Sequence, residues 1–107
     1  MDLVWAFLSG ALIANTVPHF VHGISGKRFF TPWSRRSSDG LSSATENVLW
    51  ATVNLGLGVW LFRIGQVGIV GARTNKILFM VGGLVLSLLL SWSFTKRREA
   101  VKSGKKK

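Results

Sequence analysis

Three long stretches without a charged residue limit what this chain can fold into. They cover residues 3–22, 47–62 and 77–94, and all 14 Lys and Arg and all 4 Asp and Glu residues lie outside them. An uncharged apolar run of about 18 residues is long enough to cross a bilayer as a helix. The first and third runs reach that length, and the second falls slightly short of it. The pattern predicts an all-α membrane protein with three transmembrane helices.

The length of 107 residues leaves room for one domain. We expect that domain to cover residues 1–95. The predicted spans follow the uncharged runs: about 3–22, 46–63 and 77–94. The end of the second span stays open, because Arg63 either ends it or lies at the membrane surface while the helix continues to Gly71. Asp2 is the only charge before Lys27, so the first span lacks the positive start of a cleaved signal peptide and is expected to be retained.

The Lys and Arg content of the short segments predicts the orientation of the spans. The loop 23–46 carries four such residues, the tail 95–107 carries seven, and the loop 63–76 carries three. With three spans, the first loop and the tail share one side of the membrane, and their basic excess places that side in the cytoplasm. The N-terminus is therefore predicted outside and the C-terminus in the cytoplasm.

The tail 96–107 reads KRREAVKSGKKK and has few residues that it could bury. It is predicted to be a disordered basic segment. Each Lys or Arg beside a membrane gains about 1 kcal/mol from anionic headgroups. The net charge of +10 is therefore attributed to membrane topology and lipid contact, and no nucleic-acid partner is expected.

Polar residues inside two of the spans predict how these spans pair. Asn15, His19 and His22 share one helix face, and so do Asn47 and Asn54. At 1.5 Å per residue, the two deep asparagines both lie roughly 10–12 Å from the cytoplasmic ends of their spans. The first two spans are therefore predicted to form an antiparallel hairpin with facing polar stripes made of Asn15, His19, Asn47 and Asn54.

Local signals mark the helix ends in this hairpin. Ser43 followed by Glu46 is the spacing of a capping box, which explains this carboxylate without catalysis. Pro18 is expected to lie inside the first helix and to free the carbonyl of Ala14. Gly23 is the expected C-cap of that helix.

Small residues at spacings of four predict close helix packing. They are Gly10 and Ala14 in the first span, and Gly83, Ser87 and Ser91 in the third. Such stripes let helix backbones approach each other in lipid. They are compatible both with a compact bundle and with self-association.

The two histidines, His19 and His22, are the only residues of types common in catalytic and metal sites that lie within the spans. A divalent metal needs three or four ligands, and only Asp39 and Glu46 are near enough in sequence to join them. An axial haem ligand and a pH sensor are further options. Hydrogen bonding at a helix end explains the histidines more simply, so no metal or cofactor is expected. There is no nucleophile–base pair or phosphate-binding loop, so no enzyme is expected.

Part of the sequence resembles a family of small, functionally uncharacterised bacterial integral membrane proteins. The family pattern reads PHFVxGxxGxxFxTPF and, after a short loop, SSxxxNVLWGxxN. The matching positions are Pro18, His19, Phe20, Val21, Gly23, Gly26, Phe29, Thr31, Pro32, Ser42, Ser43, Asn47, Val48, Leu49, Trp50 and Asn54. Trp33 and Ala51 depart from the pattern, which has Phe and Gly there. The resemblance implies a multi-pass protein of the bacterial inner (plasma) membrane, marks His19 rather than His22, and implies no activity.

These observations favour a membrane protein without catalytic activity. We expect it to act as a subunit or interaction partner of a membrane complex, or as a homo-oligomer. One alternative is a bundle that binds a small molecule, haem or metal at His19. Another is a small oligomeric transporter in which Asn15, His19 and Asn54 line a polar path. The expected partners are membrane lipids and another membrane protein or a second copy.

Overall fold

The computed structural model describes residues 1–34 and 40–104, with side chains up to Glu99. Its three helices are α1 (Asp2–Ile24), α2 (Ala44–Ile64) and α3 (Arg73–Gly104). Each contains a segment long and apolar enough to cross a membrane. The all-helical fold with three candidate spans is therefore confirmed, as expected of a multi-pass membrane protein.

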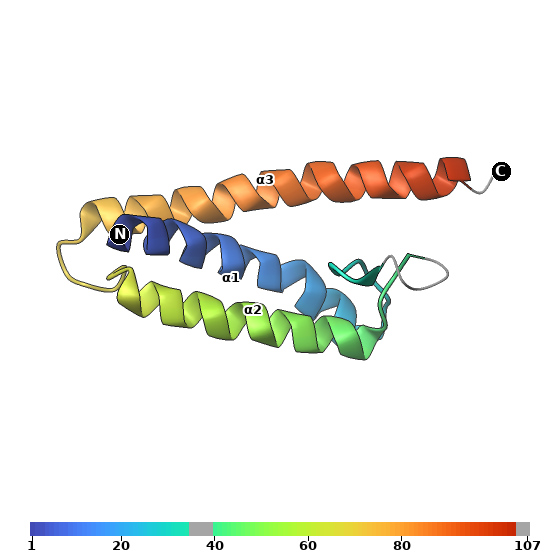
Figure 1. Cartoon of the computed structure of the whole chain (residues 1–107), viewed down its shortest axis with the longest axis horizontal. Coiled ribbons are helices and arrows are strands. Elements are labelled where there is room, and N and C mark those ends of the chain that lie inside the picture. Colours follow the sequence, from blue (N-terminus) through green and yellow to red (C-terminus); the bar gives the residue numbers. More distant parts are fainter. Residues whose placement is uncertain (35–39, 105–107) are drawn as a thin grey trace.

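The three helices alternate in direction, and α1 is the central one (Figure 1). It packs along both α2 and α3, whereas the described backbones of α2 and α3 do not come close to each other. Their side chains meet where the rings of Phe62 and Phe79 lie edge to face, 5.3 Å apart. The loop after α1 lies between the diverging ends of α2 and α3 (Figure 1).

Glycines make the contact between α1 and α3 possible. A Cβ on Gly10 would overlap the backbone carbonyl of Phe79, and a Cβ on Gly82 would overlap that of Phe7. Gly83 lies against Gly10 and Ala14. Of the predicted stripe on α3, only Gly83 joins this contact, because Ser87 and Ser91 are exposed. The small residues of the first span are therefore used within the chain, in a compact bundle.

The contact between α1 and α2 combines a small residue with hydrogen bonds. Gly58 admits the side chain of Ile13, which a Cβ at this position would meet at 2.6 Å. Beside it, the hydroxyl of buried Ser9 donates to the Gly58 carbonyl at 2.6 Å. The Ser9 hydroxyl thus finds its hydrogen-bond partner across the hairpin, as a polar group of a helix pair in lipid requires.

The helix α2 ends at Ile64, so the alternative in which it continues to Gly71 is wrong. Gln66 adopts a left-handed backbone with φ of 54°. Around it, the N–H of Gln66 donates to the Arg63 carbonyl and that of Val67 to the Phe62 carbonyl. This is the hydrogen-bond pattern of a Schellman motif, which closes a helix.

The end of α1 also differs from the expectation. Gly23 lies inside the helix, where a Cβ would meet Val48 and the Ala44 carbonyl of α2. The left-handed residue that closes the helix is Gly26, with φ of 71°. Gly23 therefore serves close helix packing and is not the C-cap. The helix runs through Pro18 as predicted.

The third helix begins at Arg73 and continues to Gly104, ten residues beyond the predicted end of the span at Phe94. The disordered tail predicted for 96–107 is therefore wrong for 96–104, and 105–107 lie outside the described residues. Contacts with the loop after α1 hold this part of α3, through Phe94 and through Arg97 and Arg98 beyond it. Phe94 packs on Phe29 and Phe30 of the loop after α1, at 4.6 and 5.5 Å between ring centroids.

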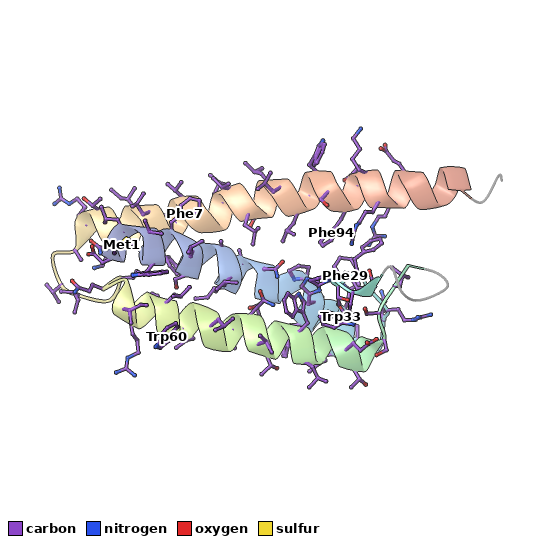
Figure 2. All side chains as sticks on the ribbon, in the orientation of Figure 1. Met1, Phe7, Phe29, Trp33, Trp60 and Phe94 are labelled. Carbon is purple, nitrogen blue, oxygen red and sulfur yellow. The ribbon has the colours of Figure 1, made fainter. Side chains whose placement is uncertain are left out.

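The outer faces of the helices are apolar, as Figure 2 shows for side chains that point away from the bundle. Exposed large residues of α3 include Leu84, Leu88 and Trp92. Such a surface suits lipid rather than water.

At the end of the bundle near the N-terminus, Asn75 donates to the Gly65 carbonyl at 2.6 Å and to the Asp2 carboxylate at 2.9 Å.

Candidate functional site

Asn47 organises the end of the bundle where α1 ends and α2 begins. Its side chain is fully buried. Its amide nitrogen donates to the backbone carbonyls of Phe29, Ser42 and Ser43, at 3.2, 3.4 and 3.0 Å. Its amide oxygen lies 2.8 Å from Nδ1 of His19. One side chain thus ties α2 to α1 and to both ends of the described loop.

These bonds fix the tautomer of His19. The Asn47 nitrogen is occupied by carbonyls, so its oxygen must accept, and His19 Nδ1–H must donate. In the neutral ring the other nitrogen, Nε2, then carries a lone pair. No described residue bonds to it. The ring is only 3% exposed and touches Phe29, Trp50 and Phe94 edge-on, so its orientation is held on several sides.

The loop between α1 and α2 folds back on itself at this site. Phe29 and Ser42 form an antiparallel bridge with two backbone hydrogen bonds of 3.1 and 2.8 Å. The hydroxyls of Thr31 and Ser42 are also hydrogen-bonded. The loop therefore covers the ends of the helices with Phe29, Phe30 and Thr31, all buried.

Ser43 and Glu46 form a capping box at the start of α2. The second carboxylate oxygen of Glu46 accepts from the indole N–H of Trp33 at 2.8 Å. Both oxygens are therefore used to hold the helix start and the loop. Glu46 is a structural residue, and it does not face His19.

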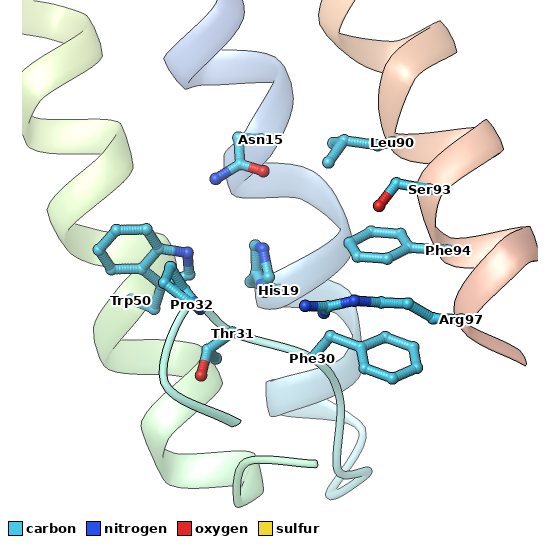
Figure 3. A pocket seen from close by; sticks show the side chains of 10 residues that line it. All are labelled: Asn15, His19, Phe30, Thr31, Pro32, Trp50, Leu90, Ser93, Phe94 and Arg97. Atoms are coloured by element: carbon cyan, nitrogen blue, oxygen red, sulfur yellow. The ribbon is translucent and has the colours of Figure 1, made fainter. Parts of the chain in front are cut away.

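A cavity of about 200 Å³ lies beside His19, between the three helices and the loop (Figure 3). Its polar walls come from Asn15 and His19 of α1, Trp50 of α2, and Ser93 and Arg97 of α3. Figure 3 shows the Arg97 side chain reaching from α3 toward His19, with the indole nitrogen of Trp50 also on the side of His19. Residues from all three helices thus converge on one space.

Arg97 enters this cavity without a carboxylate partner among the described residues. Its guanidinium carbon lies 4.9 Å from the centre of the Phe30 ring, a cation–π arrangement. Arg98, the next residue, lies over Phe29 at 5.9 Å and does not line the cavity. The contact with the Phe30 ring leaves N–H groups of the guanidinium available as hydrogen-bond donors.

Of the other predicted polar residues, Asn15 lines the cavity, whereas Asn54 and His22 do not. Asn15 donates to Asn54 at 2.9 Å, and Asn54 donates to the Trp50 carbonyl at 2.8 Å. The predicted contact between the two asparagines across the hairpin is therefore present. His22 donates to the Pro18 carbonyl at 2.7 Å, stacks on Phe29 at 3.9 Å, and does not line the cavity.

Three residues of the site were not predicted from the sequence: Trp50, Ser93 and Arg97. Trp50 belongs to the pattern of the resembling family, which was its only signal. Ser93 lies in the last turn of the span that was expected to end at Phe94, and Arg97 follows that span. Only the continuation of α3 brings them to the loop.

The arrangement has features of a binding site. It offers several hydrogen-bond donors, a cation and aromatic walls, which are the elements of a ligand pocket. Among the described residues, no group of three or more His, Asp or Glu side chains is placed to hold a metal ion. Asp39, one of the candidate ligands, lies outside the described residues.

Comparisons with known proteins were made with the whole chain. No family model matches it, and neither the curated proteins nor the solved structures contain a significant match. The family resemblance noted from the sequence therefore stays a prediction.

Proposed function

We propose that this chain is a membrane protein without catalytic activity that binds an amphiphilic molecule from the bilayer in the cavity beside His19. The observation that carries this proposal is the fixed tautomer of His19. Asn47 holds Nδ1–H, and the ring, whose Nε2 has no partner in the part of the chain that the structure describes, lies beside a space that Arg97 enters. A cavity with apolar walls and a few convergent polar groups is a default site for a ligand.

The proposal includes the bacterial inner membrane and a defined orientation, with the N-terminus outside and the C-terminus in the cytoplasm. Its support is the basic excess of the loop 23–46 and the tail, which lie at the same end of the bundle (Figure 1). The chain has no cysteine, so single cysteines at exposed Ser25 and Val70 report the orientation. In intact cells an impermeant maleimide should label Val70→Cys only, and the reverse would contradict the orientation.

Filling the cavity should remove the ligand. Ser93 lines the cavity and is half-buried, whereas Ser91 on the same helix is exposed. We expect the wild-type chain, extracted in mild detergent, to retain one amphiphile per chain in native mass spectrometry. Ser93→Trp should lose most of it, because the indole occupies the space, and Ser91→Trp should keep it. Equal retention by both variants would contradict the proposal.

A second candidate, the subunit of a complex or a homo-oligomer, is favoured by the exposed Ser87 and Ser91. These small residues remain unpacked within the chain and could admit a neighbouring helix. Crosslinking of Ser91→Cys in native membranes tests it, with Leu89→Cys, an exposed position on the opposite side of α3, as the control. Equal crosslinking at the two positions would show random collision rather than a specific contact.

A further inference from the structure

The polar atoms around the cavity favour one chemical class of ligand. Three hydrogen-bond donors have no acceptor among the described residues: the Arg97 guanidinium, the Trp50 indole N–H and the Ser93 hydroxyl. A group rich in acceptor oxygens and negatively charged complements this set, and a phosphate is such a group. No described carboxylate lines the cavity, so an anion there meets no like charge.

Two acceptors lie on the α1 wall of the same cavity. They are Nε2 of His19 and the side-chain oxygen of Asn15, whose nitrogen is already used on Asn54. An acceptor of this kind needs a donor from the ligand. A phosphodiester carries no proton of its own, so the donor must come from another part of the headgroup, and a hydroxyl meets this need.

An apolar groove continues from the cavity along the bundle. It has a volume of about 300 Å³ and shares Asn15 and Trp50 with the cavity. Its other walls are mainly aliphatic, from Leu8 and Leu12 of α1, Leu57 of α2 and Leu86 of α3. The groove exists because α2 and α3 both pack on α1 while their own backbones stay apart. From Trp50 to Leu57 it runs roughly 10 Å along the helix axis.

Polar cavity and apolar groove together match the two parts of a lipid. We propose that the site binds an anionic glycerophospholipid whose headgroup carries a hydroxyl, of the phosphatidylglycerol class, with an acyl chain in the groove. The phosphate accepts from Arg97, Ser93 and Trp50, and the headgroup hydroxyl donates to His19. This inference rests on the proposed function and adds the class of ligand. It differs from general attraction of the tail to anionic headgroups, because it names one cation and one groove.

Two matched pairs of variants test the site. Arg97→Gln removes the cation of the cavity, and Arg98→Gln removes the neighbouring cation outside it. Leu57→Trp fills the groove, and Leu55→Trp places the same ring on the exposed face of α2 outside the groove. The full chain is purified in a neutral detergent and titrated with phosphatidylglycerol or phosphatidylcholine, with binding followed by native mass spectrometry. Thermal unfolding verifies that each variant is folded.

The wild type should bind phosphatidylglycerol about tenfold more tightly than phosphatidylcholine, because both lipids carry a phosphate but only phosphatidylglycerol has a hydroxyl for His19 and no headgroup cation beside Arg97. Arg97→Gln should weaken both lipids through the phosphate and should reduce this preference, because phosphatidylglycerol has no headgroup cation to balance its phosphate. Leu57→Trp should weaken both lipids alike, and the two control variants should behave as wild type. Equal losses for Arg97→Gln and Arg98→Gln would indicate general charge attraction and overturn the inference.

The proposed function and this inference fail in different ways. Retention of an amphiphile that Ser93→Trp removes, without dependence on Arg97 or on headgroup charge, would overturn only the ligand class. If neither the wild type nor any variant retains an amphiphile, both the proposed function and the ligand class are overturned.

Discussion

Replacing Asn47 by Ala should destabilise the protein by about 3 kcal/mol, because His19 Nδ1–H loses its partner inside the bundle and three backbone carbonyls, each still bonded to a backbone N–H, lose their second hydrogen bond. The expected result is a large drop in the midpoint of thermal unfolding in detergent, followed by tryptophan fluorescence. Asn47→Asp keeps an acceptor for His19 but loses the donors to the carbonyls, so it should be destabilised as well.

Asn54 provides the comparison for this prediction. It makes one hydrogen bond to α1, through Asn15, and its other bond stays within α2. Polar pairs between membrane helices average about 0.6 kcal/mol, so Asn54→Ala should have a small effect. Thr52→Ala, on an exposed side chain that bonds only within its own helix, should have almost none. A loss for Asn47→Ala no greater than that for Asn54→Ala would contradict the role given to Asn47.

Adding one methyl group at Gly82 should have the second large effect. The new Cβ would overlap the backbone carbonyl of Phe7, and backbone cannot move aside as a flexible side chain can. The helices α1 and α3 would have to separate. Overpacking of this kind costs about 1–3 kcal/mol. Gly82→Ala should therefore lower the unfolding midpoint, and Gly10→Ala should do the same through the carbonyl of Phe79.

Gly56 is the matched control on α2, because a Cβ there meets nothing within 4 Å. Gly56→Ala should leave the protein unchanged or more stable by up to about 1 kcal/mol, from the helix propensity of alanine. Equal destabilisation by Gly82→Ala and Gly56→Ala would show that α1 and α3 do not pack as described.

The hairpin of α1 and α2 could be predicted because polar residues are rare in apolar segments and must find each other. Asn15 and Asn54 lie at similar distances from the cytoplasmic ends of their spans, which predicted that they meet. Their side chains form a hydrogen bond in the structure. The capping box at Ser43 was likewise readable, since it depends on residues three positions apart. Local and periodic signals of this kind can be recognised in a single sequence.

The third helix could not be predicted equally well. The segment after Phe94 is rich in charged residues, and the sequence alone therefore indicates a solvated tail. The helix continues because Phe94 and Arg97 contact Phe29 and Phe30, which are more than sixty residues away in the chain. Contacts between distant residues leave no periodic signal, so the cavity and its cation became visible only in three dimensions.

In the proposed complex, His19 faces a bound ligand while Asn47 holds its other nitrogen. The chain has two histidines, so histidine-selective ¹⁵N labelling gives two rings to distinguish, with His22→Gln for assignment. On addition of phosphatidylglycerol, the Nε2 resonance of His19 should move as it accepts a hydrogen bond, while its Nδ1–H and both nitrogens of His22 stay in place. An unchanged His19 Nε2 in saturating lipid, or a shift confined to His22, would contradict the account.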